Sequence, residues 1–373
     1  MKIIVIGCGK IGKTIIEHVS KEGHSLVIVD NNREKVEELI ERYDVMGVVG
    51  NGASLDIQEE AGVKSADLVI AVTPEDEINI LASMVAKKLG ASSTIARVRN
   101  PEYLRQTKLM QEELGLSMVV NPEQETADEI INMVNLPSLL KLEPFAKGKV
   151  NLVEILVEEN NPLIGETLIT MSKKIKTKVL ICAIQRASHV IIPNGNFKIE
   201  QGDRLSITAN ASSLVTFLKE LNLIKSPLKN IMIIGGGKIS YYLAKELSNK
   251  KYHIKLIEMN KNRAEEMAEA LPKVDVICGD GTDHDLLIEE GIEASDACIA
   301  LTNVDEENII VSMYATRLKI KKVIAKIKRN SFLTMVNDLG IASIVSPKDI
   351  VASKIISYIR ALSNKRGSNV LTL

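Results

Sequence analysis

The sequence predicts an α/β fold in which two doubly wound parallel sheets are separated by a small α+β module. Three observations support this prediction. Short aliphatic runs alternate with amphipathic helical patterns in both halves of the chain, as in sheets built from β-α-β units. The two halves repeat one another. Each half also opens with a strand that runs directly into a glycine-rich turn and a helix.

The internal repeat is a series of landmarks in the same order. KIIVIG at residues 2–7 corresponds to NIMIIG at residues 230–235, so Gly235 lies 228 positions after Gly7. Asp30 and Glu258 end the next strand of each copy and are again 228 positions apart. Further matched landmarks are Gly50-Asn51-Gly52 with Gly279-Asp280-Gly281, Thr73, Asp76 and Asn79 with Thr302, Asp305 and Asn308, and residues 95–99 with 324–328. Matches in this order indicate a duplicated domain.

The pattern of each segment gives the expected elements. In the first copy we expect strands near residues 2–6, 26–30, 45–49, 67–72, 93–98 and 117–120. Pro101 and Pro122 stand where helices would begin, a position that suits proline. From about Asn151 to Leu221 the pattern changes to the strands LVEILV, VLICAI, HVIIP and RLSIT, with a short helix near 166–175 and a closing helix.

Domain boundaries follow from these patterns. We expect a first nucleotide-binding domain at residues 1–140, the small module at 141–225 and the second copy of the domain at 226–366. The segment Ser226-Pro227-Leu228-Lys229 is typical of a linker into the second copy.

Composition favours aliphatic cores and gives no sign of a nucleic-acid partner. Hydrophobic residues make up 45% of the chain, aromatic residues only 3%, and tryptophan is absent, which suits buried parallel sheets. The 47 Lys and Arg residues balance 48 Asp and Glu residues, so charge does not favour nucleic acid. Cys8, Cys182, Cys278 and Cys298 form no CxxC pair, and we expect core thiols in a reducing cytosol rather than a metal site.

Localisation is predicted from what the sequence lacks. No apolar run approaches the ~20 residues of a membrane span, and the N-terminal strand does not have the regions of a signal peptide. We therefore expect a soluble, cytoplasmic protein whose membrane role, if it has one, comes through a partner.

The first glycine loop is the main candidate site. Gly7-Cys8-Gly9-Lys10-Ile11-Gly12 follows a strand and opens a helix, as in the dinucleotide-binding turn of Rossmann domains. Its glycines permit the tight turn, the approach of a pyrophosphate and the packing of helix on strand, and the amides of the helix N-terminus bind phosphate. Asp30, 23 positions after Gly7, suits a ribose diol and repels a 2′-phosphate. It therefore favours NAD, NADH or an adenine nucleotide such as ATP or ADP over NADP. The alternative is a Rossmann-like domain that has lost its ligand.

The second loop departs from this pattern. Gly235-Gly236-Gly237-Lys238-Ile239 is followed by Ser240 in place of the third glycine, and the acid is the longer Glu258. We expect nucleotide binding here too, with a purely structural copy as the alternative.

Other candidates lie at the carboxyl ends of the later strands. Asn51 and Gly52, with Asp280 and Gly281, follow the third strand, where an adenine edge would lie; Thr73, Pro74 and Thr302 follow the fourth; Arg97, Arg99 and Lys326 belong to the fifth. Arg97 and Arg99 alternate, so we expect both to face one side and to reach a phosphate. The alternatives are turn formation for the threonines and a solvated strand end for the arginines. Near Asp280, Asp283 is expected to be a helix N-cap rather than a metal ligand.

The order of these motifs resembles that of a known family. The order GCGKIG, LVIVD, GNG, VTPEDEIN, ARVRNPEY, a small α+β module and GGGKIS is similar to the cytoplasmic regulatory subunit of Trk-type potassium uptake systems, built from RCK (or KTN) domains. The resemblance covers essentially the whole chain. It implies NAD(H) or adenine nucleotides in the Rossmann crevice and a homo-oligomeric, tetrameric ring on the inner face of the membrane, beneath a Trk- or Ktr-type potassium-translocating subunit.

The resemblance also implies a second small module after the second Rossmann copy. Residues 367–373 would begin it, since Asn369-Val370-Leu371-Thr372 looks like its first strand.

Two alternatives to a nucleotide sensor are an NAD-dependent dehydrogenase and a scaffold with vestigial sites. An NAD-dependent dehydrogenase needs a proton-transferring group beside the nicotinamide, and the middle module offers Lys173, Lys174 and His189 without a spacing that suggests a pair. We expect a sensor without catalytic residues, in which bound nucleotide shifts the population of two conformations.

Overall fold

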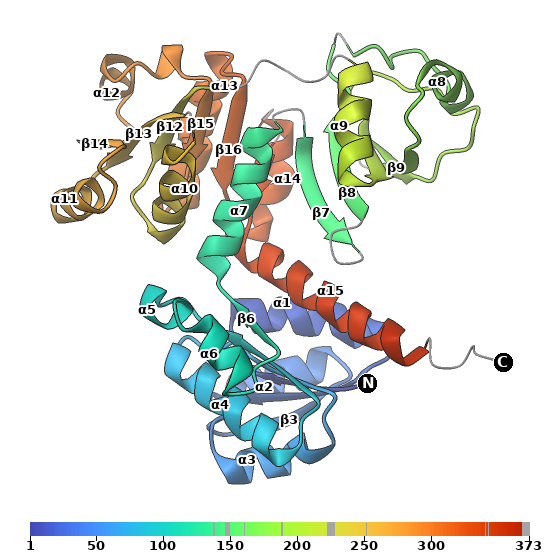
Figure 1. Ribbon diagram of the computed structural model, residues 1–373, viewed down its shortest axis with the longest axis vertical. Helices are drawn as coiled ribbons and strands as arrows, with labels where there is room; N and C mark the ends of the chain where they lie inside the picture. The colour runs from blue at the N-terminus through green and yellow to red at the C-terminus, as the bar shows by residue number, and fades with distance from the viewer. Residues whose placement is uncertain are drawn as a thin grey trace. The chain divides into compact units, whose positions relative to one another are not determined.

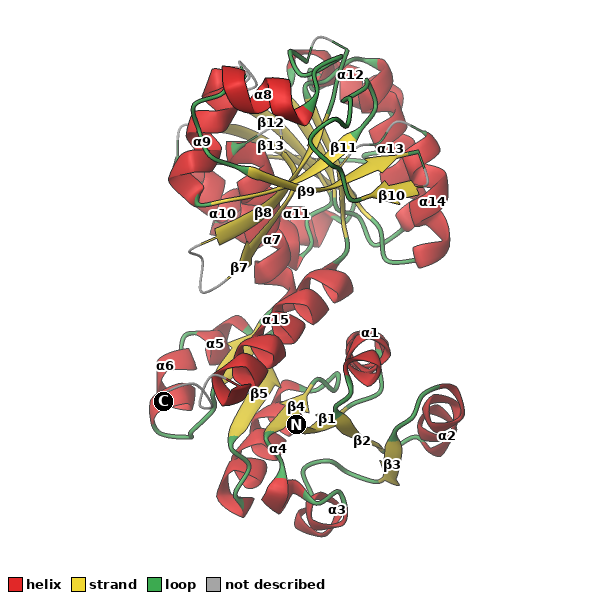
Figure 2. Cartoon of the chain, turned by 90° about the vertical axis from the view of Figure 1, so that its right-hand side faces the viewer, coloured by secondary structure: helices red, strands yellow, loops and turns green. Residues whose placement is uncertain are grey.

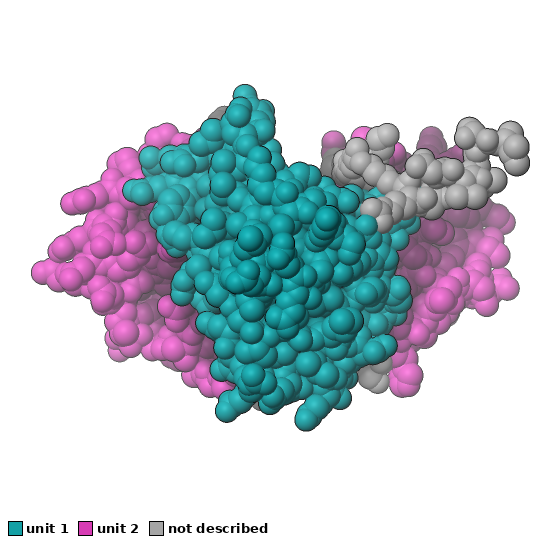
Figure 3. Space-filling view, turned by 90° about the horizontal axis from the view of Figure 1, so that it is seen from below, with its two compact units in different colours: residues 1–125, 346–373 teal, residues 126–345 magenta. Residues whose placement is uncertain are grey.

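The chain forms two compact units (Figure 1; Figure 3). The computed structural model describes residues 1–136, 139–145, 150–159, 161–187, 189–221, 228–250, 252–339, 341 and 343–367. The first unit contains residues 1–125 and the C-terminal segment from Ser346, and the second contains residues 126–345. The units therefore do not follow the boundaries 1–140 and 226–366, which were drawn from the repeat and remain predictions.

The first unit is built on a six-stranded parallel sheet. Its strands are β1 (Lys2–Ile6), β2 (Ser25–Asp30), β3 (Met46–Val49), β4 (Leu68–Ala71), β5 (Ser93–Arg97) and β6 (Met118–Val120), in the order β3-β2-β1-β4-β5-β6. The six predicted strands are thus confirmed. Because the order reverses between β1 and β4, the carboxyl ends of these two strands flank the crevice in which such sheets bind ligands.

Helices cover both faces of this sheet (Figure 2). They are α1 (Lys10–Val19), α2 (Arg33–Arg42), α3 (Leu55–Glu60), α4 (Asp76–Leu89), α5 (Pro101–Leu104) and α6 (Thr107–Glu112), with short 3-10 turns at Ser20–Glu22 and Val63–Ser65. Pro101 begins α5, and Pro122 begins α7 (Pro122–Asn135), as predicted.

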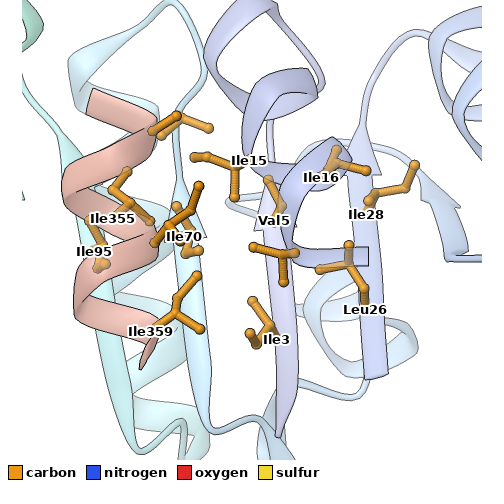
Figure 4. Packing of buried hydrophobic residues seen from close by; sticks show 14 of the residues in the cluster. Ile3, Val5, Ile15, Ile16, Leu26, Ile28, Ile70, Ile95, Ile355 and Ile359 are labelled. Carbon is orange, nitrogen blue, oxygen red and sulfur yellow. The ribbon is translucent and has the colours of Figure 1, made fainter. Parts of the chain in front are cut away.

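The last helix of the chain completes the core of the first unit. α15 (Pro347–Gly367) packs against α1, and its Ile355 and Ile359 lie among Ile3, Ile70 and Ile95 of the sheet (Figure 4). Two ion pairs join it to the same unit, Arg360 with Glu22 and Lys354 with Glu125. A helix that follows the second sheet in sequence is therefore part of the first hydrophobic core.

The second unit contains the repeated sheet. Its strands are β12 (Asn230–Ile234), β13 (His253–Glu258), β14 (Asp275–Cys278), β15 (Ala297–Ala300), β16 (Lys322–Lys326) and β17 (Ser343–Val345), in the order β14-β13-β12-β15-β16-β17. Its helices are α10 (Lys238–Ser248), α11 (Lys261–Ala270), α12 (His284–Glu289), α13 (Asp305–Arg317) and α14 (Asn330–Asp338), with a 3-10 turn at Ile292–Ala294. The same strand order in both sheets confirms the predicted duplication.

Most of α7 belongs to this second unit. Its Ile130 and Val134 are buried, and its Asn135 accepts a hydrogen bond of 3.0 Å from the hydroxyl of Tyr252, between α10 and β13. The helix that follows each sheet in sequence thus belongs to the other unit: most of α7 is part of the second unit, and α15 is part of the first.

The middle module is an antiparallel sheet. Its strands are β7 (Leu139–Phe145), β8 (Val150–Leu156), β9 (Leu180–Arg186), β10 (His189–Ile191) and β11 (Arg204–Ala209), in the order β10-β9-β11-β8-β7, with α8 (Leu168–Lys174) and α9 (Ala211–Glu220). The sequence did not predict β7, whose segment LLKLEPF contains Pro144. Proline within a sheet is confined largely to edge strands, and β7 is an edge strand.

The cysteines only partly follow the expectation of core thiols. Cys8 and Cys298 are buried and Cys182 is half-buried, but Cys278 is exposed. Cys278 ends β14, which is an edge strand with less cover than the central strands. The prediction of a core thiol is therefore wrong for Cys278.

Among the described residues, no helix is both long enough and apolar enough to cross a membrane, and no group of three His, Cys, Asp or Glu side chains could hold a metal ion. The predicted strand at residues 369–372 and the first two residues of the expected linker, Ser226 and Pro227, lie outside the described residues.

Replacing Ile355 with alanine tests the role of α15 in the first core. This side chain is fully buried, so Ile355→Ala should lower the free energy of unfolding of the first unit by about 2–5 kcal/mol. Urea denaturation combined with native-state hydrogen exchange would assign the loss to this unit. Ser357→Ala, at an exposed position of the same helix, is the matched control. Equal effects of the two variants would show that α15 does not stabilise this core.

Candidate functional site

Close contacts at two glycines fix the first glycine loop. Gly7 has a φ of +102°, and a Cβ atom there would lie 2.8 Å from the backbone nitrogen of Thr73. A Cβ atom on Gly12 would lie 1.9 Å from the carbonyl oxygen of Gly7. By contrast, no atom lies within 4 Å of the Cβ position of Gly9. The outer two glycines thus pack the loop against strand and helix, and the middle one faces open space.

The helices that follow the two loops begin without side-chain caps. Gly9 precedes α1 and Gly237 precedes α10; neither helix has a side-chain hydrogen bond at its N-cap or an acid in its first turn. The next helix of each copy is different, since Asn32 and Asn260 cap α2 and α11. Uncapped amides and the positive end of the helix dipole make the starts of α1 and α10 suited to an anion such as phosphate.

The acid of each copy bonds to the glycine loop. Asp30 Oδ2 accepts a hydrogen bond of 2.7 Å from the backbone N–H of Cys8, and its Oδ1 accepts one of 2.9 Å from Asn32. Glu258 makes the same pair, with Oε2 2.5 Å from the nitrogen of Gly236 and Oε1 2.8 Å from that of Asn260. A carboxylate has about four lone-pair sites, so each acid can still accept bonds from the hydroxyls of a ribose.

The thiol of Cys8 takes no chemical part in this arrangement. Cys8 is buried, and its burial, with a further contribution from the Asp30 carboxylate, raises the pKa of the thiol to about 12. Since the thiolate is the reactive form of cysteine, only the backbone of Cys8 is available to the site.

Ser240 is accommodated by a hydrogen bond in the second loop. Its hydroxyl donates to the carbonyl oxygen of Gly235, and the residue is buried. In the first copy a side chain at the equivalent Gly12 would collide with the carbonyl of Gly7. The spacing between loop and helix must therefore differ between the two copies.

A buried asparagine joins the ends of β4 and β5. Asn79 is fully buried; its Oδ1 accepts hydrogen bonds from the backbone N–H (2.7 Å) and hydroxyl (2.8 Å) of Thr73, and its Nδ2 donates to the carbonyls of Thr73 (3.0 Å) and Arg97 (2.9 Å). Asn308 repeats the three bonds to backbone groups, with Thr302 and Lys326. The Thr73 hydroxyl thus bonds within the fold, in line with the alternative that we weighed for this residue.

An acid beside each asparagine holds the segment after the fifth strand. Asp76 Oδ2 accepts hydrogen bonds from the backbone of Arg99 (2.8 Å) and Asn100 (2.7 Å), and Asp305 does the same for Lys328 and Arg329. In the sequence these asparagines and acids stand out only as landmarks of the repeat. Their recurrence at the same places in both copies is the signal that could have identified them.

The predicted cations have separate partners. Arg97 Nη1 donates to the carbonyl of Thr73 (2.8 Å), and the buried Lys326 Nζ donates to the carbonyl of Leu301 (2.9 Å). Arg99 forms an ion pair with Glu123. Because β5 ends at Arg97, the alternation of strand residues does not extend to Arg99, and it gives no reason to place both arginines on one side.

The residues after the third strand have clear structural roles. Asn51 accepts a hydrogen bond from Ala53, and Asp280 accepts two from Thr282, whose backbone bond is the main cause of a lowered pKa of the Asp280 carboxyl. A Cβ atom on Gly52 or Gly281 would lie 2.1 or 2.3 Å from the side chain of Ile6 or Ile234, so close packing requires both glycines.

The remaining predicted residues vary in exposure. Asp283 caps α12 by accepting a bond from Asp285, as predicted. Lys10, Lys238 and Pro74 are exposed, Ile11 is half-buried and Ile239 is buried.

Comparison with known sequences identifies related proteins. Residues 3–122 and 231–347 match the TrkA-N domain, and residues 152–222 match the TrkA-C domain. The Trk system potassium uptake protein TrkA of Vibrio alginolyticus is 36% identical over 366 residues, which cover 96% of this chain and 79% of that protein. The protein of the same name from Haemophilus influenzae is 33% identical over 377 residues, covering 100% and 81%.

Solved structures share the fold. The GsuK channel matches with a TM-score of 0.71 at 20% identity, over 98% of this chain and 64% of that chain. A structure of the GsuK channel bound to NAD matches with a TM-score of 0.70, also at 20% identity and with the same coverage. At this identity the likeness establishes the fold alone.

Replacing Asn79 tests whether it holds the edge of the first crevice. Asn79→Ala would remove the hydrogen bonds of Asn79 to the Thr73 N–H and to the Arg97 carbonyl, so we expect the free energy of unfolding to fall by at least about 2 kcal/mol. Hydrogen exchange should show the loss of protection at the backbone N–H of Thr73. Asn308→Ala is the matched variant and should act at Thr302 and Lys326. If Asn79→Ala leaves exchange at Thr73 unchanged, the proposed role of Asn79 is wrong.

Proposed function

This chain belongs to the TrkA family of Trk system potassium uptake proteins, and we propose that it is a nucleotide-sensing regulatory subunit that gates a membrane potassium-translocating partner. In this proposal NAD(H) or an adenine nucleotide binds the glycine-loop crevice of each copy. The observation that carries it is the pairing, twice in one chain, of an uncapped helix N-terminus with an acid that has spare acceptor capacity.

The first crevice suits a dinucleotide without a 2′-phosphate. The amides at the start of α1 would bind the pyrophosphate over the open face of Gly9, and Asp30 would accept hydrogen bonds from the ribose hydroxyls. A 2′-phosphate would place a second negative charge beside this carboxylate, so NADP(H) should bind more weakly. The GsuK channel, whose fold this chain shares, has been solved with NAD and with ADP bound.

The structure favours a sensor over a dehydrogenase. Lys174 is engaged with Glu166 at 2.5 Å, and His189 lies on the exposed edge strand β10 of the middle module. At the edge of the first crevice the polar side chains are bonded within the fold. Asn79 and Asp76 bond to backbone groups, and Arg99 bonds to the carboxylate of Glu123. These side chains hold the crevice in shape, which suits reversible binding of a ligand.

The first unit offers a route by which bound nucleotide acts. The amides proposed to bind phosphate lie at the N-terminus of α1, and buried side chains of the same helix pack on α15. α15 follows β17 of the second copy after a single residue, Ser346. A ligand that favours one position of α1 would therefore favour one position of α15. The shift between conformations is limited by the difference in the ligand's affinity for them.

Replacing Asp30 tests both the site and the function. Asp30→Ala removes an acceptor of charge-assisted bonds worth about 1.5–3 kcal/mol, so we expect NADH affinity at the first site to fall about tenfold or more. Calorimetric titration with NAD, NADH, ATP and ADP measures the loss, with Glu258→Ala as the matched variant. Potassium flux in vesicles that contain the translocating partner should then depend less strongly on NADH.

Two results would count against this proposal. Unchanged NADH affinity in Asp30→Ala would remove the assignment of the ribose site. Turnover of NADH with a reducible substrate, without any effect of nucleotide on flux, would favour the dehydrogenase.

The two sites are expected to differ. Ser240 and the longer Glu258 change the second loop, so we predict that the first site binds the dinucleotide more tightly and that the second is weaker or prefers a mononucleotide. The full chain is needed for this test, because residues of α15 complete the core of the first unit. Titration of Glu258→Ala reports the first site, and titration of Asp30→Ala reports the second. A tighter NADH site in Asp30→Ala than in Glu258→Ala would reverse the order.

A further inference from the structure

The acids of the two crevices differ in length yet bind the same loop atoms. Glu258 has one more methylene than Asp30, but each carboxylate bonds to the first backbone amide after the leading glycine, at 2.5 Å and 2.7 Å. Each also accepts a hydrogen bond from the backbone amide two residues after it, that of Asn260 or Asn32. The extra methylene of Glu258 must therefore be accommodated between strand and loop.

The space for this methylene comes from a missing side chain. A Cβ atom on Gly236 would lie 2.9 Å from Glu258 Oε2, 3.1 Å from its Cγ and 3.2 Å from its Cβ. These distances are shorter than ordinary contacts between such atoms, which begin near 3.5 Å. The backbone conformation does not require a glycine at position 236, because the φ of Gly236 is not in the left-handed region. Its lack of a side chain is explained by the space that Glu258 fills.

The first copy shows the complementary choice. Cys8 occupies the position equivalent to Gly236, and its side chain is buried. The Asp30 carboxylate lies close enough to contribute to the raised pKa of the Cys8 thiol. A side chain after the leading glycine is thus found with the short acid, and no side chain with the long acid.

We propose that the residue after the leading glycine and the acid of the second strand form a size-matched pair that positions the ribose-binding carboxylate: Cys8 with Asp30, and Gly236 with Glu258. The pair is a specificity determinant for adenine nucleotides that carry a free ribose 2′-hydroxyl. This assignment rests on the proposed nucleotide function, but the steric match itself does not depend on a ligand.

The consequence is that neither residue can be exchanged alone. In Gly236→Cys the new Cβ atom would push the Glu258 carboxylate away from the loop. In Glu258→Asp the space beside Gly236 would be left empty, so the shorter carboxylate would not be held in one position. The double variant Gly236→Cys with Glu258→Asp recreates the pair of the first copy and should restore the position of the carboxylate.

Titration of the full chain tests this coupling, with Asp30→Ala as the background so that the second site is read alone. The probes are ADP and 2′-deoxy-ADP, because their affinity ratio reports the bond to the 2′-hydroxyl rather than the integrity of the fold. Each single variant should weaken ADP binding about tenfold and bring the ratio toward one. The double variant should recover both quantities to within about threefold.

Additive losses in the double variant would overturn the proposal. Asp30→Glu and Cys8→Gly, each alone and then together, repeat the test at the first site in a Glu258→Ala background, with the same expected rescue.

A ligand-free measurement separates this inference from the proposed function. Should the chain with both native acids bind no adenine nucleotide, the proposed function fails. The melting temperatures of the same four proteins in each set then decide the steric match. Gly236→Cys should lower the melting temperature, and Glu258→Asp should restore part of the loss. A Gly236→Cys variant that melts as its parent does, or losses that simply add, would show that the two positions are not coupled.

Discussion

The hydrogen bond from the glycine loop to the acid of the second strand is the interaction on which each crevice depends. It fixes the loop against the neighbouring strand in both copies, through Asp30 in one and Glu258 in the other. With the loop held there, the following helix begins at an open glycine whose amides have no side-chain partner. The same carboxylate keeps free lone pairs. One contact thus sets the positions of the groups that we propose to bind phosphate and ribose.

Sequence reasoning predicted the sheets well because their signals are local. Six strands of the first copy, the duplication and the glycine loop follow from apolar runs and turn residues that stand next to one another in the chain. The roles of Gly52 and Gly281 were less accessible, because only the packed structure shows that Ile6 and Ile234 leave no room for a side chain. The assumption that Arg99 continues the alternation of β5 failed because the strand ends two residues earlier.

Other features depend on contacts between distant segments. Asn79 reaches Arg97 only after α4 and β5 have packed, and nothing in its own neighbourhood in the sequence marks it. The position of α15 in the first unit was missed because its partners, α1 and the first sheet, lie more than 200 positions earlier in the sequence. The match between Gly236 and Glu258 is likewise invisible in a motif, which treats the position between the glycines as free. In each case the repeat itself supplies an internal comparison that a single copy would lack.

The place of α15 also has a consequence for how the chain matures. During synthesis the first sheet leaves the ribosome long before Ile355 and Ile359, which cover Ile3 and Ile70 in the finished core. At rates of about 5–20 residues per second, the interval is on the order of ten seconds or more. Throughout it, one apolar face of the nascent first unit lacks its native cover and is open to aggregation or to chaperones. Translation speed and chaperone supply should therefore influence the yield of this protein more than its final stability would suggest.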